Sequence, residues 1–128
     1  MSMVLVVDDD SSTRMVLRMI LEKDGHEVVE AEDGEAALVH ITPRLPDIVT
    51  TDLTMPVLNG EGLILRLRSE PRTAAIPIVV VSGNPAAARA LHASGVVEAV
   101  VMKPFAASEL IECIRAIAAR FMPIGPQP

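Results

Sequence analysis

The sequence has 128 residues, half of them hydrophobic, which is enough for one domain with a sizeable core. Its net charge is −6, only two residues are aromatic, and no run of lysine or arginine occurs, which argues against direct nucleic acid binding. A single cysteine excludes an internal disulfide, no signal peptide is evident, and no apolar run reaches the roughly 20 residues that span a bilayer, so we expect a cytoplasmic protein without membrane contact.

The first half of the chain alternates short apolar runs with segments of helical period. Met3–Val7 is a continuous apolar run, typical of a strand buried on both faces. Ser11 or Ser12 is expected to cap the helix that follows, and Gly25 to lie just beyond its end. In chain order there follow a more polar strand over His26–Ala31, a helix capped by Asp33 and stopped by Pro43, and a third strand over Asp47–Thr51.

The second half continues this alternation. In chain order its segments are a loop over Met55–Gly60, a helix containing Leu63, Ile64, Leu65 and Leu67, a strand over Ile76–Val81, an Ala-rich helix over Pro85–Ser94, a strand over Ala99–Met102 and a helix over Ser108–Phe121. Residues 123–128 form a Pro-rich tail, which cannot continue the helix. The pattern predicts a doubly wound α/β domain over residues 1–122, with a five-stranded parallel sheet and five helices.

Reactive polar residues follow four of the predicted strands. Asp8, Asp9 and Asp10 follow the first strand, Asp52 the third, Ser82 the fourth and Lys103 the fifth. Because ligands of open parallel sheets bind at the carboxyl ends of the strands, we expect these side chains to meet. Crowded carboxylates repel one another, and Mg²⁺, which prefers oxygen ligands, would offset the repulsion. A carboxylate beside a metal and a lysine can attack a phosphoryl group in line.

Four segments, in this order along the chain, resemble the receiver domains of response regulators in two-component signalling. They are Val6–Asp10, Asp52–Pro56, Val81–Gly83 and Lys103–Phe105. The resemblance covers the chain from Met3 to Phe121 and implies the flavodoxin-like strand order 2-1-3-4-5. It also implies that Asp52 accepts a phosphoryl group from a histidine kinase or a histidine phosphotransfer protein, and that the domain then signals by contact with a downstream protein.

The resemblance assigns the metal ligands. Asp9 would bind Mg²⁺ directly and Asp8 mostly through water. Asp52 and the main-chain carbonyl of Thr54 would complete the protein's contribution. Asp10 lies one residue beyond the acidic pair of the family, and no ligand role is assigned to it.

The resemblance also assigns the contacts of the phosphoryl group, to Ser82 and Lys103, and the bond between Lys103 and Pro104 is often cis in this family. Thr54 and Asn84 would tune the lifetime of the phosphoryl group by shaping the access of water. Many receivers carry an aromatic residue three positions before the lysine. Here that residue is Val100, so a switch based on an aromatic rotamer does not transfer.

Other interpretations remain open at this point. Asp8–Asp10 alone could be a polar strand end followed by a helix cap. A phosphohydrolase of the haloacid dehalogenase type usually carries a second Asp two residues after its nucleophile, where this sequence has Thr54. A pseudo-receiver, which only binds partners, would normally lack an acidic residue or the lysine. The chain could also be the receiver domain of a longer response regulator or hybrid kinase, and homodimer formation is left open.

Overall fold

Apolar, mostly β-branched segments form a parallel sheet in the order β2-β1-β3-β4-β5, as predicted. The structure, a computed structural model, describes residues 2–121. The strands are β1 (Met3–Val7), β2 (Glu27–Ala31), β3 (Ile48–Thr51), β4 (Ile78–Ser82) and β5 (Ala99–Met102). Every residue of β1, β3 and β4 is buried, whereas β2 and β5, at the two edges, mix buried and half-buried residues. The edge position of β2, which the expected strand order 2-1-3-4-5 implied, is therefore confirmed.

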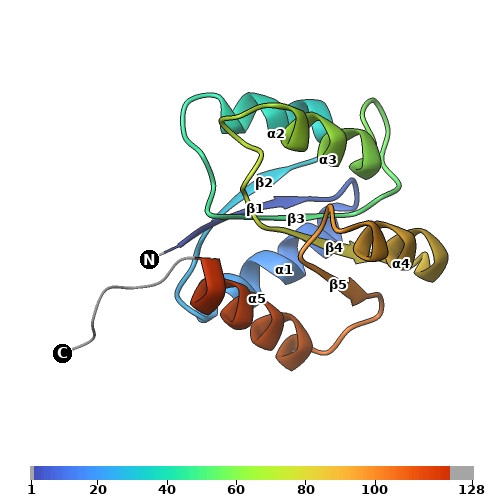
Figure 1. Cartoon of the computed structure of the whole chain (residues 1–128). Coiled ribbons are helices and arrows are strands. Elements are labelled where there is room, and N and C mark those ends of the chain that lie inside the picture. Colours follow the sequence, from blue (N-terminus) through green and yellow to red (C-terminus); the bar gives the residue numbers. More distant parts are fainter. Residues whose placement is uncertain (1, 122–128) are drawn as a thin grey trace.

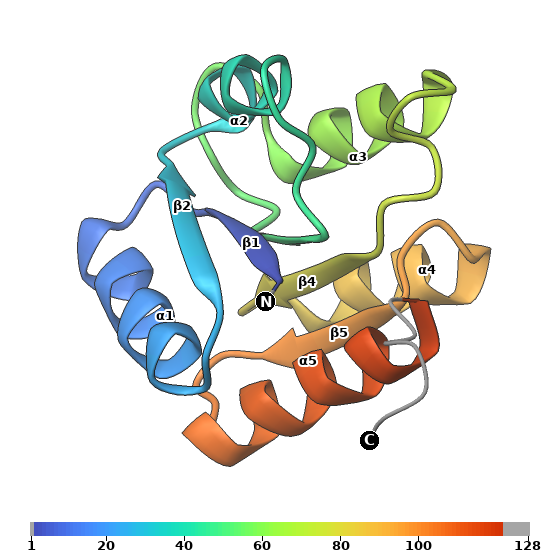
Figure 2. The same cartoon turned by 90° about the vertical axis from the view of Figure 1, so that its left-hand side faces the viewer.

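Within residues 2–121, five helices cover the two faces of the sheet (Figure 1). They are α1 (Ser11–Lys23), α2 (Gly34–Ile41), α3 (Gly60–Ser69), α4 (Pro85–Ser94) and α5 (Ala107–Phe121). Helices α1 and α5 lie on one face, and α2, α3 and α4 lie on the other (Figure 2). Alternate residues of β1 serve the two cores, since Leu5 and Val7 pack with α2, α3 and α4 while Val4 and Val6 pack with α1 and α5.

The start of α1 differs from the prediction. Asp10, and neither Ser11 nor Ser12, is the N-cap, because Asp10 is extended while both serines are already helical. Its carboxylate accepts hydrogen bonds from the Ser12 N–H at 3.2 Å and the Thr13 hydroxyl at 2.6 Å. These bonds lower the pKa of Asp10, the Thr13 bond most. The carboxylate of Asp10 thus stabilises the start of α1.

Other boundaries fall close to their predicted positions. Asp33 caps α2 through the Ala36 N–H at 2.8 Å, and Gly25, with φ of 92°, follows α1 as predicted. Strand β4 begins at Ile78 instead of Ile76, because Pro77 has no N–H to donate to the ladder, and it extends through Ser82.

The third helix contains all four of its predicted apolar residues, of which Leu63, Ile64 and Leu67 are buried and Leu65 is 67% exposed. Helix α4 has only one fully buried residue, Ala88. The predicted tail over 123–128 and the domain end at 122 lie outside the described residues. Among residues 2–121, no helix is long and apolar enough to cross a bilayer.

Candidate functional site

Three carboxylates meet at the carboxyl edge of the sheet because β1 and β3 are neighbours. The Asp8 N–H extends the ladder to β2 by donating to the Ala31 carbonyl at 3.1 Å, and the Asp52 N–H donates to the Val7 carbonyl at 3.0 Å. One carboxylate oxygen from each of Asp8, Asp9 and Asp52 lies within 4.8 Å of the others. The structure therefore brings together the acidic residues that strand topology alone predicted.

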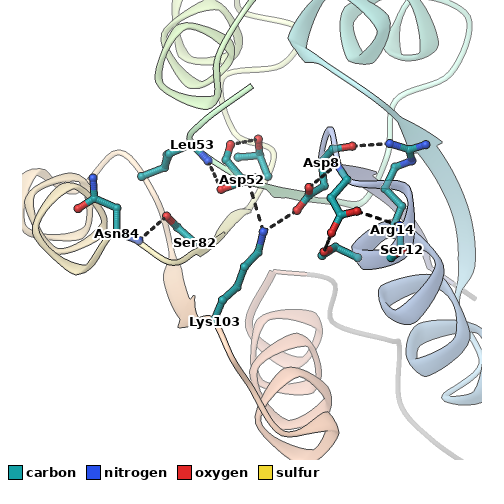
Figure 3. Close-up of polar contacts among 11 residues, drawn as sticks. Asp8, Ser12, Arg14, Asp52, Leu53, Ser82, Asn84 and Lys103 are labelled. Carbon is teal, nitrogen blue, oxygen red and sulfur yellow. Dashed lines mark hydrogen bonds and ion pairs between the residues drawn. The ribbon is translucent and has the colours of Figure 1, made fainter. Parts of the chain in front are cut away.

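The carboxylates are oriented by hydrogen bonds from the backbone and from Lys103 (Figure 3). Asp8 Oδ1 accepts the Asp10 N–H at 2.9 Å, and Asp52 Oδ1 accepts the Leu53 N–H at 2.7 Å. The second oxygen of each faces Lys103 Nζ, at 2.8 Å for Asp8 and 3.3 Å for Asp52. Both carboxylates therefore have one oxygen fixed by the backbone and one turned toward the same cation.

Lys103 holds its charge although burial opposes it. The desolvation of its ammonium group lowers its pKa, but the hydrogen bond and charge of Asp8, with those of Asp52, outweigh this and raise the pKa above the usual value. Lys103 also donates its backbone N–H to the Ser82 carbonyl at 2.9 Å, which ties the end of β5 to that of β4. The peptide bond that joins it to Pro104 is cis, as expected.

The donor set fits a hard divalent cation. All three groups offer carboxylate oxygens, and the cluster is graded from the buried Asp8 through the half-buried Asp52 to the exposed Asp9, which leaves one side open to water. Neighbouring ligands of one Mg²⁺ lie about 3 Å apart, so carboxylate oxygens within 4.8 Å of one another need to move by at most about 2 Å to share an ion. Thr54 lies exposed two residues after Asp52, at the start of the loop into α3.

Ser82 and Asn84 lie beside this cluster, at the end of β4. Ser82 is 2% exposed, and its hydroxyl oxygen accepts the Asn84 N–H at 3.0 Å. The side chain of Asn84 turns toward α4 and caps it, its Oδ1 accepting the Ala87 N–H at 3.2 Å (Figure 3). The hydroxyl of Ser82 is thus linked through one residue to the first turn of α4.

A family model described as the response regulator receiver domain matches residues 4–115. The chain belongs to this family. Among solved structures, this receiver domain resembles the chemotaxis protein CheY4 of Vibrio cholerae, with a TM-score of 0.83, 28% identity and coverage of 91% of this chain and 98% of that one. It also resembles the receiver domain of the Francisella response regulator 1452, with a TM-score of 0.83, 26% identity and coverage of 94% and 98%. Receiver domains of this family belong to two-component systems and bind Mg²⁺ at an acidic pocket.

Curated relatives differ widely in length. Protein PilH of Pseudomonas aeruginosa is 37% identical over 82 residues, which are 64% of this chain and 68% of that protein. The phosphate regulon regulatory protein PhoB of Escherichia coli is 30% identical over 125 residues, 95% of this chain and 54% of that protein. The receiver domain spans 10% of a gliding motility regulatory protein of Myxococcus xanthus and 11% of the sensor histidine kinase TmoS of Ectopseudomonas mendocina.

Val100 lies in β5, three residues before Lys103, where many receiver domains carry an aromatic residue. It is half-buried and packs against the core formed with α2, α3 and α4. A small branched side chain fixed in this way offers no ring whose rotamer could report on the site.

Sequence reasoning missed Arg14 and Glu30. Arg14 Nη1 donates to the Asp8 carbonyl oxygen at 2.6 Å, and its Nε donates to Glu30 Oε1 at 3.1 Å. The available signal was an arginine one turn after the helix cap and a glutamate near the end of the neighbouring strand. Nothing in the sequence showed that the two side chains meet next to the acidic pair.

Proposed function

We propose that this receiver domain accepts a phosphoryl group on Asp52 from a histidine kinase or a histidine phosphotransfer protein, with Mg²⁺ as cofactor. The observation that supports this most strongly is the convergence of Asp52 with Asp8, Asp9 and Lys103 within hydrogen-bonding or ligand-sharing distance. An isolated Asp at a strand end would not suffice, because the transferred group brings negative charge that must be neutralised.

The chemistry follows from the orientation of Asp52. Its Oδ1 is held by the Leu53 N–H, so Oδ2, on the side of Lys103, is the oxygen we assign to attack phosphorus. A bond forms between Oδ2 and phosphorus while the bond from phosphorus to the donor's imidazole nitrogen breaks, and the imidazole keeps the electron pair. Lys103 Nζ can contact one phosphoryl oxygen, and the Ser82 hydroxyl, whose oxygen accepts the Asn84 N–H, has its own hydrogen free to donate to another.

We assign the metal ligands to Asp8, Asp9, Asp52 and the main-chain carbonyl of Thr54. Mg²⁺, when bound, supplies charge neutralisation at the phosphoryl oxygens. Asp8 stands against Lys103 and is buried, which suits a ligand that acts through water, whereas the exposed Asp9 can reach the ion directly. Apart from its own phosphorylation and slow autodephosphorylation, we propose no enzymatic activity.

We further propose a cytoplasmic domain that signals through contact with a downstream protein, with or without homodimer formation. A receiver within a longer response regulator or hybrid kinase is the alternative, and it is supported by relatives such as PhoB and TmoS, of which this domain spans 54% and 11%. The site chemistry is the same in both cases.

The proposal is tested by incubation with acetyl phosphate and Mg²⁺, followed by intact mass spectrometry. We expect the addition of one phosphoryl group to the wild type and none to Asp52→Asn. Chelation of Mg²⁺ should abolish the addition. The proposal fails if the wild type is never modified, or if Asp52→Asn is modified to the same extent.

A further inference from the structure

Arg14, in the first turns of α1, contacts the backbone of the acidic edge, the carboxyl edge of the sheet that carries Asp8, Asp9 and Asp52. Its side chain is 17% exposed. The guanidinium group reaches the Asp8 carbonyl oxygen at 2.6 Å and leaves the Asp8 carboxylate to Lys103 (Figure 3). Arg14 therefore acts on the backbone of the acidic pair and does not compete for its carboxylate oxygens.

That carbonyl is where the chain turns from β1 into α1. Since a peptide unit is planar, the Asp8 carbonyl and the Asp9 N–H and Cα share one plane. Fixing the direction of the carbonyl thus fixes the direction in which Asp9 leaves the strand. Among residues 2–121, no hydrogen bond or ion pair of the Asp9 carboxylate is found, so its position depends on this backbone. The peptide plane held by Arg14 therefore fixes the backbone from which the Asp9 carboxylate reaches to within 4.8 Å of Asp52.

Glu30 of β2 anchors the guanidinium and provides an internal comparison. Glu30 Oε1 accepts from Arg14 Nε at 3.1 Å, and its Oε2 accepts from Arg18 Nη1 at 3.1 Å. Arg18 lies one helical turn further along α1 and donates its Nη2 to the Val28 carbonyl at 2.9 Å. Both arginines lie on α1 and bind Glu30, but only Arg14 also contacts Asp8.

We propose that Arg14 is a positioning residue for the Mg²⁺ site, which it organises through the Asp8 carbonyl oxygen. The inference rests on the proposed function and adds to it a residue outside the ligand set. Residues that orient metal ligands typically contribute about 10- to 100-fold to metal affinity.

The test is isothermal titration of Mg²⁺ into the wild type, Arg14→Ala, Arg14→Lys and Arg18→Ala. We expect the Kd of Arg14→Ala to rise about tenfold. Arg18→Ala, which loses ion pairs with Glu30 and Glu22, should change the Kd by less than about threefold. Arg14→Lys should also bind more weakly, because one ammonium group cannot bridge the Asp8 carbonyl and Glu30 as a planar guanidinium does.

Melting temperatures without Mg²⁺ separate positioning from general stability. A purely structural role would lower the melting temperature and weaken Mg²⁺ binding alike in Arg14→Ala and Arg18→Ala, which would overturn the inference. Wild-type affinity in both Arg14 variants would overturn it as well. If Arg14→Ala does not fold, the affinity of Arg14→Lys decides alone. A wild type that takes up no Mg²⁺ would instead refute the proposed function itself, and the inference with it.

Discussion

Lys103 offsets part of the negative charge of Asp8 and Asp52 at the carboxyl edge of the sheet. Its ammonium group lies 2.8 Å from Asp8, whose side chain is 1% exposed, and 3.3 Å from Asp52. Burial of a carboxylate costs free energy unless a positive charge or hydrogen-bond donors compensate for the lost water. In the absence of Mg²⁺, the lysine is the positive charge in contact with both carboxylates.

Replacing Lys103 with Met should destabilise the metal-free protein by about 2 kcal/mol, since charge-assisted hydrogen bonds are lost from a buried carboxylate. Mg²⁺ should then stabilise this variant more than the wild type, because the carboxylates lack their competing cation. Urea unfolding with and without Mg²⁺ measures both effects. Lys23→Met, in the exposed last turn of α1, is the matched control. Equal stabilities of the two variants would contradict the prediction.

At the scale of elements, the start of α3 is packed directly against the backbone of the site. The Gly60 N–H donates to the Leu53 carbonyl at 3.1 Å. A Cβ at Gly60 would lie 2.0 Å from the Asp52 carbonyl oxygen and 2.8 Å from the Leu53 Cα. Only glycine allows α3 to begin so close to β3, and this contact fixes the loop that carries Thr54.

Gly60→Ala should therefore destabilise the domain by about 3 kcal/mol, the upper end of the usual cost of overpacking. Gly83→Ala is the matched control, since a Cβ there would meet nothing within 4 Å. Urea unfolding should show a loss in the first variant and little change in the second. Similar losses in both would argue that the close approach at Gly60 is relieved without cost.

Helix α4 begins at a cap that also faces the site. Asn84 caps it with its side chain and donates its N–H to Ser82. Asn84→Ala should cost about 1 kcal/mol of stability through the lost cap.

We also expect exchange of Thr54 or Asn84 to change the rate of autodephosphorylation without abolishing phosphorylation. Decay of the phosphorylated form, followed by intact mass, measures the rate. Equal rates in the wild type and both variants would count against the prediction.

For the molecule as a whole, the strand order is what creates the site. Residues 8 and 103 are 95 positions apart, yet their side chains are hydrogen-bonded because β1 and β5 end at the same edge. Parallel strands with helices on both faces leave that edge as the one place where acidic loops converge. Stability and metal binding are therefore coupled through the charges gathered there.

Asp52→Asn tests this coupling. Removing one of three neighbouring negative charges should raise the stability of the metal-free domain by about 1 kcal/mol. It should also reduce the rise in melting temperature that Mg²⁺ brings, because one ligand charge is gone. Thermal melts of both proteins with and without Mg²⁺ make the comparison. Identical shifts in the two proteins would indicate that Asp52 does not interact with the other carboxylates.

Sequence reasoning succeeded where topology dictates the outcome and failed where local geometry decides. Apolar runs such as Met3–Val7 located the strands, and the convergence of Asp8, Asp52 and Lys103 followed from their parallel order. The cap at Asp10 was missed because three adjacent polar residues were all suitable by type. The contact between Arg14 and Asp8 depends on a rotamer and on Glu30, neither of which any periodicity encodes.

In helix α4 only Ala88 is fully buried, while Ala87 and Leu91 are partly buried against the core. A sideways shift of α4 therefore exposes less apolar surface than the same shift of α3, which has four buried residues. Since Val100 has no ring to reorient, the hydrogen bond from the Asn84 N–H to the Ser82 hydroxyl is the contact that joins the site to the first turn of α4. We expect a phosphoryl group on Asp52 to act on a partner protein through the displacement of α4.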